Sequence, residues 1–258
     1  MVSIQKEKVL GTHHWNERMF SFSTTRAPGL RFESGQFVTL GLKVDGRPLM
    51  RAYSMASASY DEHLEFLSIK VPEGPLTSRL QHLREGDEVL VSGKASGSLL
   101  ISDLLPGKNL YLLCTGTGLA PFMSVIRSPD TYERFEKVIL MHGVRYKSEL
   151  AYYNLITEQL PTDEYLGAII RDKLIYCPTV TREPFHRAGR ITTLLSREEC
   201  AIDLNLPVLN PLTDRAMICG SPSMLKDVSA LLNARGFRVS PGIGQLADYV
   251  VERAFAEK

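Results

Sequence analysis

The length, charge and composition of this chain exclude several classes of protein. Its 258 residues correspond to two domains at about 150 residues per domain. The 30 Lys and Arg residues stand against 29 Asp and Glu residues, and the formal charge of +1 removes the electrostatic argument for a nucleic-acid binder. The hydrophobic share of 44% is that of a globular protein, and no uninterrupted apolar run approaches the roughly 18 residues of a membrane span.

The N-terminal residues and the cysteines bear on location and metal chemistry. Residues 1–8 are not followed by the apolar block that a secretory signal needs, so we expect a cytoplasmic protein. The four cysteines include no closely spaced pair of the kind found in zinc, iron–sulfur or dithiol sites. His13 and His14 are neighbours whose side chains point to opposite faces of a strand. We therefore expect no metal site. We also expect a monomer, and the charge and the lack of a long apolar run indicate that it binds neither nucleic acid nor membranes.

The first half of the chain has the alternating pattern of short β-strands. The predicted strands cover residues 20–24, 36–42, 51–57, 64–71 and 88–92. Asp45-Gly46 is a hairpin signal, and residues 74–80 read as a turn into a short helix with Thr77 or Ser78 near its cap. The pattern predicts an antiparallel barrel or sandwich over residues 1–105, closed by a Pro-Gly turn.

The second half, residues 106–258, has a different rhythm. Apolar strand candidates alternate there with segments of helical patterning, at residues 110–114, 138–142, 173–177, 215–219 and 249–255. This alternation predicts a doubly wound, largely parallel α/β sheet. In such a sheet, ligands bind beyond the carboxyl ends of the strands, so the residues after each strand carry the functional prediction.

The first of these strand ends is a turn rich in glycine. Thr115-Gly116-Thr117-Gly118 leads to Pro121, which suits the first turn of a helix, and backbone amides at a helix start attract phosphate. Taken alone, the pattern also fits a plain tight turn. The other strand ends carry small, hydroxyl or arginine residues: His142 to Arg145, Thr181-Arg182, Arg190, and Cys219 to Pro222.

The arginines favour NADP over NAD. Pro121 stands where the standard dinucleotide motif has its third glycine, and no acidic residue follows the second strand for the ribose hydroxyl. If Arg182 and Arg190 each contribute about 1.5 to 3 kcal/mol to the 2′-phosphate, the preference for NADP is roughly 100-fold to 10,000-fold. The alternative is that each arginine is a solvated surface charge.

A second set of residues, in the first half, suits a flavin nucleotide. In Arg51-Ala52-Tyr53-Ser54, strand alternation sends Arg51 and Tyr53 to one face, where Tyr53 can stack on a flat ring and Arg51 can reach a phosphate. Residues 74–78 supply a second turn able to accommodate phosphate. An ordinary barrel strand with a surface arginine and a half-buried tyrosine remains the alternative.

Five motifs together resemble the bacterial ferredoxin (flavodoxin)–NADP reductases in order and spacing, over essentially the whole chain. They are Arg51-Ala52-Tyr53-Ser54, Gly74-Pro75-Leu76-Thr77-Ser78, Gly116 to Phe122, Cys219-Gly220-Ser221 and Glu252-Arg253-Ala254-Phe255. The resemblance implies an FAD-binding antiparallel β-barrel followed by an NADP-binding α/β domain. It also implies a small acidic electron-transfer protein, ferredoxin or flavodoxin, as the partner.

The resemblance assigns cofactor contacts residue by residue. For FAD it implies Arg51, Ala52, Tyr53, Ser54, Ser68, Ile69, Lys70, Val71, Gly74, Leu76, Thr77, Ser78 and Thr117, with Ala254, Phe255 and Lys258 from the C-terminal tail. For NADP it implies Gly116, Arg145, Thr181, Arg182, Arg190, Gly220 and Asp227. Asp227 could equally be a partner of a helix dipole.

The resemblance also implies which residues take part in the reaction. Tyr53 would support one face of the flavin and Ala254 would leave the other to nicotinamide, while Ser54, Cys219 and Glu252 would line the reacting centre. A buried structural cysteine remains the alternative for Cys219.

Two other functions remain open from the sequence. One is a reductase on the same scaffold that serves an oxygenase or reduces free flavin, and the other is a flavin- or nucleotide-binding module without turnover. Lys43, Arg47 and Arg84 are positive side chains of the flavin half that could dock an acidic partner.

Overall fold

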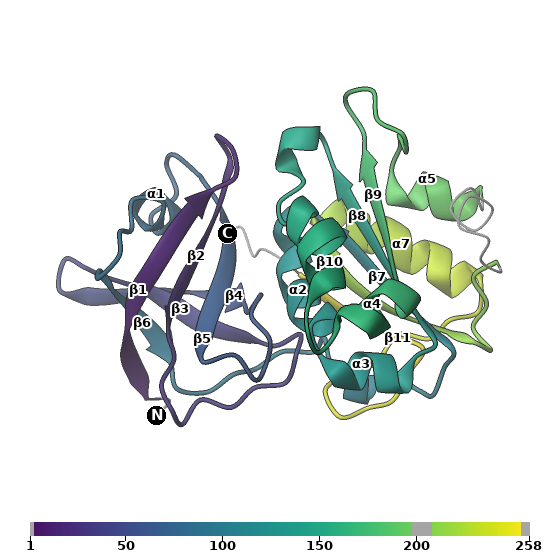
Figure 1. The fold of residues 1–258 in the computed structure, drawn as a ribbon, viewed down its shortest axis with the longest axis horizontal. Helices are drawn as coiled ribbons and strands as arrows, with labels where there is room; N and C mark the ends of the chain where they lie inside the picture. The colour runs from purple at the N-terminus through teal and green to yellow at the C-terminus, as the bar shows by residue number, and fades with distance from the viewer. Residues whose placement is uncertain (1–2, 198–207, 254–258) are drawn as a thin grey trace. The chain divides into compact units, whose positions relative to one another are not determined.

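The structure is a computed structural model and describes residues 3–197 and 208–253 (Figure 1). The chain forms two compact units. The first comprises Met1–Gly97 with Ala120–Val125, and the second comprises Ser98–Leu119 with Ile126–Lys258. The described helices include none long and apolar enough to cross a membrane.

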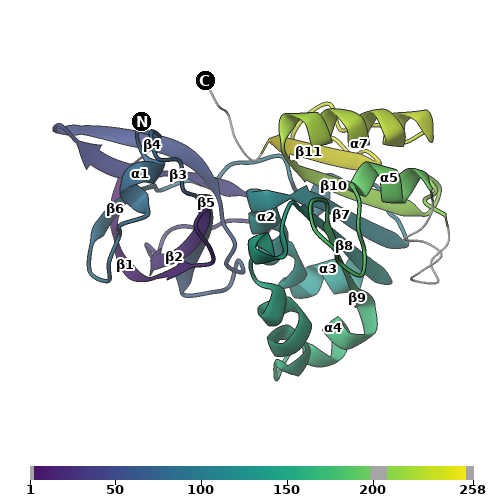
Figure 2. The same cartoon turned by 90° about the horizontal axis from the view of Figure 1, so that it is seen from above.

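The first unit is built on a six-stranded antiparallel sheet in the order β4-β3-β6-β1-β2-β5. Its strands are β1 (Ile4–His14), β2 (Met19–Thr25), β3 (Phe37–Val44), β4 (Arg47–Ser54), β5 (His63–Ile69) and β6 (Glu88–Ser92). The sheet curls around a core that includes Phe20, Phe22, Leu40 and Phe66 (Figure 2). The antiparallel architecture predicted for this half is confirmed.

Three local features of the barrel unit differ in how well the sequence predicts them. At the β3–β4 turn, Asp45 and Gly46 have φ angles of 48° and 79°, the left-handed values that a two-residue hairpin requires. Strand β1 was not predicted, because its pattern is Ile-Gln-Lys-Glu-Lys and only Glu7 and Val9 are buried along it. Helix α1 (Thr77–Leu80) has Leu76 at its cap position, and no side chain bonds to the cap.

The second unit contains a five-stranded parallel sheet in the order β11-β10-β7-β8-β9. Its strands are β7 (Asn109–Thr115), β8 (Lys137–Val144), β9 (Leu174–Val180), β10 (Asp214–Gly220) and β11 (Tyr249–Arg253). Strands β7 and β10 are neighbours although the chain visits β8 and β9 between them, so the topology reverses there. The predicted parallel sheet is confirmed, and this reversal marks where such sheets bind ligands.

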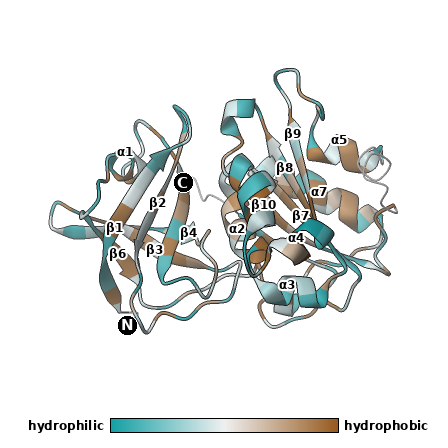
Figure 3. Cartoon of the chain, viewed as in Figure 1, coloured by the Kyte–Doolittle hydropathy of each residue, from teal (hydrophilic) through white to brown (hydrophobic). Residues whose placement is uncertain are grey.

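Helices lie on both faces of the parallel sheet (Figure 2). Helices α5 (Ile191–Ser196) and α7 (Pro222–Ala234) pack on one face, and α3 (Pro129–Arg134) and α4 (Gly167–Lys173) lie on the other. Helix α2 (Leu119–Ile126) follows a 3₁₀ turn at Gly116–Gly118. Further short turns cover Ile101–Asp103, Lys147–Glu149, Leu155–Gln159 and Leu160–Thr162. Hydrophobic residues run along the parallel strands, as expected when both faces are covered (Figure 3).

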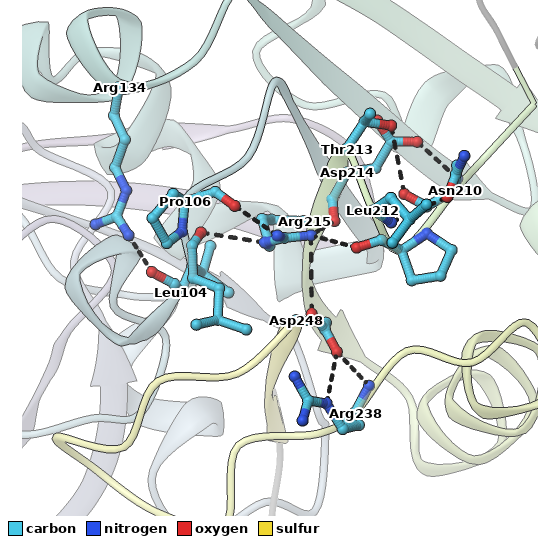
Figure 4. A network of polar contacts seen from close by, with 12 residues as sticks. Leu104, Pro106, Arg134, Asn210, Leu212, Thr213, Asp214, Arg215, Arg238 and Asp248 are labelled. Atoms are coloured by element: carbon cyan, nitrogen blue, oxygen red, sulfur yellow. Dashed lines mark hydrogen bonds and ion pairs between the residues drawn. The ribbon is translucent and has the colours of Figure 1, made fainter.

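The buried side chain of Arg215 binds the segment that precedes β7 (Figure 4). The guanidinium of Arg215 donates to the carbonyl oxygens of Leu105, at 3.1 Å, and of Pro106. It also donates to the carbonyl of Pro211, at 2.8 Å, and lies 3.8 Å from the Asp248 carboxylate. Because a buried charge needs partners, these carbonyls and Asp248 hold the connecting segment and the start of β11 against β10.

Candidate functional site

The predicted nucleotide residues after β8 and β9 are brought together by backbone pairing beyond the strand ends. Thr181 donates its N–H to the Val144 carbonyl at 3.1 Å, and Arg182 donates its N–H to the Arg145 carbonyl at 2.9 Å. The Thr181 hydroxyl also bonds the Val144 carbonyl at 3.1 Å. Arg145 and Arg182, which are 37 positions apart in the chain, are therefore neighbours.

Arg190 is carried to the same region by the loop after β9. Val180 pairs with Ala188 in a parallel bridge, Gly189 donates to the Val180 carbonyl at 3.0 Å, and the Thr179 hydroxyl donates to the Gly189 carbonyl at 2.6 Å. Arg190 then takes the cap position of α5. The sequence prediction that Arg190 stands at a helix start is confirmed.

The three arginines Arg145, Arg182 and Arg190 are exposed, and within residues 3–197 and 208–253 none forms an ion pair with a carboxylate. Arginines without an acidic partner keep their donors for an anionic ligand. This arrangement fits the 2′-phosphate of NADP.

The glycine-rich turn after β7 is shaped by close backbone approach. Gly116 has a φ of +56°, and a Cβ on Gly118 would lie 2.3 Å from the Cys219 carbonyl oxygen. A Cβ on Gly220, after β10, would lie 2.3 Å from Thr115 Oγ1. Side chains at Gly118 and Gly220 would push the ends of β7 and β10 apart. These two glycines therefore keep the strand ends close together where the topology reverses.

Thr117, inside this turn, is a buried hydroxyl in need of a partner. The residue is only 6% exposed, and its Oγ1 has no hydrogen-bond partner among the described residues. A buried hydroxyl without a partner carries a free-energy cost that a bound polar group removes. The turn thus fits the cofactor contact that the sequence predicts for Thr117.

A row of ionisable side chains crosses the parallel sheet one or two residues before the strands end. Register pairs Glu252 of β11 with Cys219 of β10, Cys219 with Cys114 of β7, and Cys114 with His142 of β8. Partners in register share a face of the sheet, and this face is opposite to the one packed by α5 and α7. We call these four side chains, Glu252, Cys219, Cys114 and His142, the buried row.

Burial keeps most of the buried row uncharged. It raises the pKa of the Cys219 thiol, with a smaller contribution from the Glu252 carboxylate, and it raises the pKa of Cys114 well above its ordinary value. Burial also lowers the pKa of His142 to about 4, while the nearby Gly116 carbonyl opposes that shift. His142 Nδ1 lies 3.1 Å from the Tyr176 hydroxyl, and its Nε2 has no hydrogen-bond partner of ordinary geometry among the described residues.

Glu252 is held by a serine that the sequence prediction missed. Ser98 donates its N–H to Glu252 Oε2 at 2.8 Å, and its Oγ lies 3.3 Å from the same oxygen. Burial raises the pKa of Glu252, and the bonds from Ser98 act in the opposite direction. A serine 154 positions before its partner, in a short Gly-Ser segment, carries no sequence signal for this contact.

In the barrel unit, the predicted flavin residues lie at the end of β4. Arg51 is exposed, Ser54 is half-buried, and Tyr53 is 8% exposed with its ring in the barrel core, edge-on to Phe66 at 6.3 Å. The Tyr53 hydroxyl lies 3.3 Å from Ser68 Oγ, and burial raises the pKa of Tyr53. Tyr53 is thus fixed by packing and by Ser68, while the exposed Arg51, whose guanidinium donates to the Met50 carbonyl at 2.9 Å, has further donors for a phosphate.

The remaining flavin candidates of this unit follow β5. That strand ends at Ile69, so Lys70 and Val71, which were predicted within it, lie in the next loop. Lys70 Nζ donates to the Asn16 carbonyl at 2.8 Å. A Cβ on Gly74 would lie 2.5 Å from Thr77 Oγ1, which packs this turn closely at the start of α1.

Four predicted site residues stand apart from these groups. Asp227 is exposed on α7, away from the buried row, since α7 packs on the opposite face. Ala254, Phe255 and Lys258 lie outside the described residues, so their predicted roles stay predictions.

Comparison with known proteins supports an architecture of two domains. Residues 5–98 match the family of oxidoreductase FAD-binding domains, and residues 112–230 match that of oxidoreductase NAD-binding domains. The chain is 62% identical over 258 residues to the ferredoxin–NADP reductase of Pseudomonas aeruginosa, covering 100% of both proteins. It is 48% identical over 250 residues to the flavodoxin/ferredoxin–NADP reductase of Rhodobacter capsulatus, covering 96% of this chain and 92% of that protein.

A solved structure agrees with these relatives. A ferredoxin NADP⁺ reductase from Neisseria gonorrhoeae, crystallised with FAD and NADP, matches with a TM-score of 0.88 at 30% identity, covering 99% of this chain and 100% of that one. The full-length identities and the two domain matches show that the chain belongs to the ferredoxin–NADP reductases, which are FAD- and NADP-binding oxidoreductases.

Proposed function

We propose that this enzyme transfers a hydride between NADP(H) and FAD, and single electrons between FAD and ferredoxin or flavodoxin. The observation that carries the proposal is the buried row, in which Cys219 and Cys114 pair where the topology reverses between β10 and β7, and Glu252 lies next to Cys219. The bound cofactors supply the hydride and electron chemistry, and the protein supplies alignment and charge control. We further propose a cytoplasmic monomer divided near residue 105, with its barrel residues Lys43, Arg47 and Arg84 docking an acidic partner.

On the NADP side, the protein binds through the exposed arginines. Arg145, Arg182 and Arg190 hold the 2′-phosphate, and Thr181 lies beside it. The Gly116 turn and Gly220 allow the dinucleotide to approach the backbone closely. Asp227, exposed on α7, would contact NADP only at the edge of this site.

On the FAD side, binding rests on the end of β4 and the turn before α1. Arg51 and Ser54 bind the pyrophosphate and the ring edge, and Tyr53 supports the flavin from the barrel core. The backbone from Ser68 to Ser78 completes this side. From the second unit, Thr117 gives its unpartnered hydroxyl to FAD.

At the reacting centre, the protein keeps charge away from the transferred hydride. Cys219 offers a small, neutral thiol beside nicotinamide, because burial raises its pKa. Glu252 orients the carboxamide or holds a proton at Oε2. By the family resemblance, Ala254, Phe255 and Lys258, which lie outside the described residues, would contact FAD, and the small side chain of Ala254 would leave one flavin face to nicotinamide.

The test is reduction of the purified, FAD-loaded enzyme by NADPH without oxygen, followed by stopped-flow absorbance. We expect NADPH to bleach the yellow protein, and Glu252→Gln to slow this step. A colourless protein, or a yellow one that NADPH does not bleach, would contradict the function. An unchanged rate in Glu252→Gln would contradict only the role of Glu252.

The electron acceptor needs a separate comparison. The NADPH-reduced enzyme is offered flavodoxin, ferredoxin and free flavin under the same conditions. We expect the two proteins to be reduced faster than free flavin, because docking holds the partner near the flavin. A preference for free flavin would replace the protein partner with a small-molecule acceptor.

A further inference from the structure

The contact between Ser98 and Glu252 joins two distant parts of the second unit. Ser98 N–H lies 2.8 Å from Glu252 Oε2 and Ser98 Oγ lies 3.3 Å from it, while the same Oγ lies 3.1 Å from the Val251 carbonyl. Both side chains are half-buried. One residue therefore offers an amide and a hydroxyl to a single carboxylate oxygen.

The Ser98 hydroxyl has one hydrogen and two acceptors within reach. When Glu252 is ionised, the hydroxyl can donate to Oε2 alongside the amide. When Oε2 carries a proton, the new O–H can donate to Ser98 Oγ, and the serine hydrogen can turn to the Val251 carbonyl. In both protonation states, Oε2 of Glu252 then keeps its hydrogen bonds to Ser98 with little movement of heavy atoms.

Few other groups compete with Ser98 for control of Glu252. From β10, the partner in register is the Cys219 thiol, and the Cys114 thiol lies behind it on β7. On β11, the neighbour Arg253 is exposed. Lys226 and Asp227 belong to α7, which packs on the opposite face and exposes both to solvent.

The balance of forces on Glu252 agrees with this geometry. Burial raises the pKa of the carboxyl group, and the amide and hydroxyl of Ser98 are the groups that lower it. Among the described residues, no cationic side chain contributes to that shift. The pKa of Glu252 therefore depends on two opposing effects, namely burial, which raises it, and the hydrogen bonds from Ser98, which lower it.

We propose that Ser98 is a positioning residue that holds Glu252 in place and lets it change protonation state without losing its hydrogen bonds. The inference rests on the proposed function, in which Glu252 acts at the reacting centre. A proton from solvent forms the O–H bond at Oε2 and returns to solvent when that bond breaks, so no electrons are gained or lost by Glu252 or Ser98.

The first measurement is independent of turnover. The oxidised, FAD-loaded enzyme is titrated while infrared difference spectra record the protonated carboxyl band that is missing in Glu252→Gln. We expect Ser98→Ala to move the titration midpoint upward by about 0.5 to 1 pH unit, because the carboxylate loses one donor but keeps the amide. Ser98→Thr, which keeps the hydroxyl, should restore the midpoint.

The second measurement is the pH profile of flavin reduction by NADPH. The step assigned to Glu252 should move in the same direction in Ser98→Ala and be absent in Glu252→Gln, and adding Ser98→Ala to Glu252→Gln should have no further effect on the profile. The matched control is Ser96→Ala, since Ser96 is exposed and pairs with Phe37 only through its backbone. Thermal melting of each variant separates a lost fold from a moved titration.

The outcomes separate the two proposals. An unmoved midpoint in folded Ser98→Ala, or one that Ser98→Thr does not restore, would overturn the role of Ser98. If Glu252→Gln leaves the rate and pH profile of reduction unchanged while Ser98→Ala still moves the infrared midpoint, the role of Glu252 in the reaction fails and its contact with Ser98 stands. Absence of any reduction by NADPH would remove the proposed function itself.

Discussion

Two groups of side chains near the carboxyl ends of the parallel strands differ in exposure and in charge. After β8 and β9, Arg145, Arg182 and Arg190 are exposed and unpaired by carboxylates within the described ranges. In the buried row, Cys219 and His142 are almost fully buried, and burial drives both toward their neutral forms. In the proposed function, charge stays available where the arginines recognise an anionic group and is removed where the hydride is transferred.

This difference has a simple physical origin. A guanidinium in water costs little to maintain and gains a strong bond when phosphate arrives. An ion in the interior loses its hydration, so thiols and imidazoles there stay neutral unless a partner compensates. The comparison predicts that removing charge matters at the exposed edge, whereas adding charge matters in the buried row.

The largest effect is expected at the exposed edge. Arg182→Ala combined with Arg190→Ala should lower the ratio of kcat/KM for NADPH to that for NADH by roughly 100-fold to 10,000-fold, since two charge-assisted contacts are lost. Steady-state kinetics with both cofactors measures the ratio. Arg31→Ala, an exposed arginine of the barrel unit, is the control and should leave the ratio unchanged. An unchanged ratio in the double variant would mean that other residues recognise the 2′-phosphate.

Lowering the pH should reduce the stability of the folded protein through His142, a member of the buried row. The pKa of His142 is about 4 in the folded protein against 6.5 for the free group, so the unfolded chain binds a proton first. The contribution of His142 to stability is complete above pH 6.5 and falls as the pH drops toward 4, by about 3 kcal/mol in total.

The measurement is urea unfolding of the protein across this pH range. His142→Gln, which keeps a side chain able to bond Tyr176, should lose that part of the pH dependence, whatever its stability at neutral pH. His186→Gln, at an exposed histidine, should retain it. If His142→Gln has the same slope of unfolding free energy against pH as the unmodified chain, His142 is not held neutral.

The glycine turn that borders both regions should tolerate no side chain. Gly118→Ala would place its Cβ 2.3 Å from the Cys219 carbonyl, which is backbone and cannot turn away. We expect a loss of about 1 to 3 kcal/mol in unfolding free energy, together with weaker NADP binding. Gly11→Ala is the control, because its Cβ would meet nothing within 4 Å. Equal stability of the two variants would show that the β7 and β10 ends can separate freely.

The smallest effect concerns the thiols of the buried row. Because burial raises the pKa of Cys114 and Cys219, both should react slowly with iodoacetamide in the native protein at pH 8. A Cys200→Ser background removes the cysteine outside the described residues. Mass spectrometry of native and urea-unfolded samples counts the alkylated thiols. Rapid alkylation of Cys219 in the native state would mean that the row is open to solvent and charged.

Much of the architecture could be predicted from local pattern. The parallel strands are continuous apolar runs, and the Asp45-Gly46 hairpin depends on two residues that accept positive φ. Strand β1 was missed because its largely polar residues are placed by pairing with β2 and β6 rather than by their own alternation. Local signals predict elements only where the side chains themselves carry the pattern.

The candidate site divides along the same line. The sequence by itself determined the motifs, the arginines in place of an acidic ribose contact, and the family resemblance, because each lies within a few neighbouring residues. Only the tertiary structure decided that Arg145 meets Arg182, that Glu252, Cys219, Cys114 and His142 form one row, and that Ser98 holds Glu252. These contacts join residues far apart in the chain, and they follow from strand order and register, which set both the neighbours of each group and the burial that shifts its pKa.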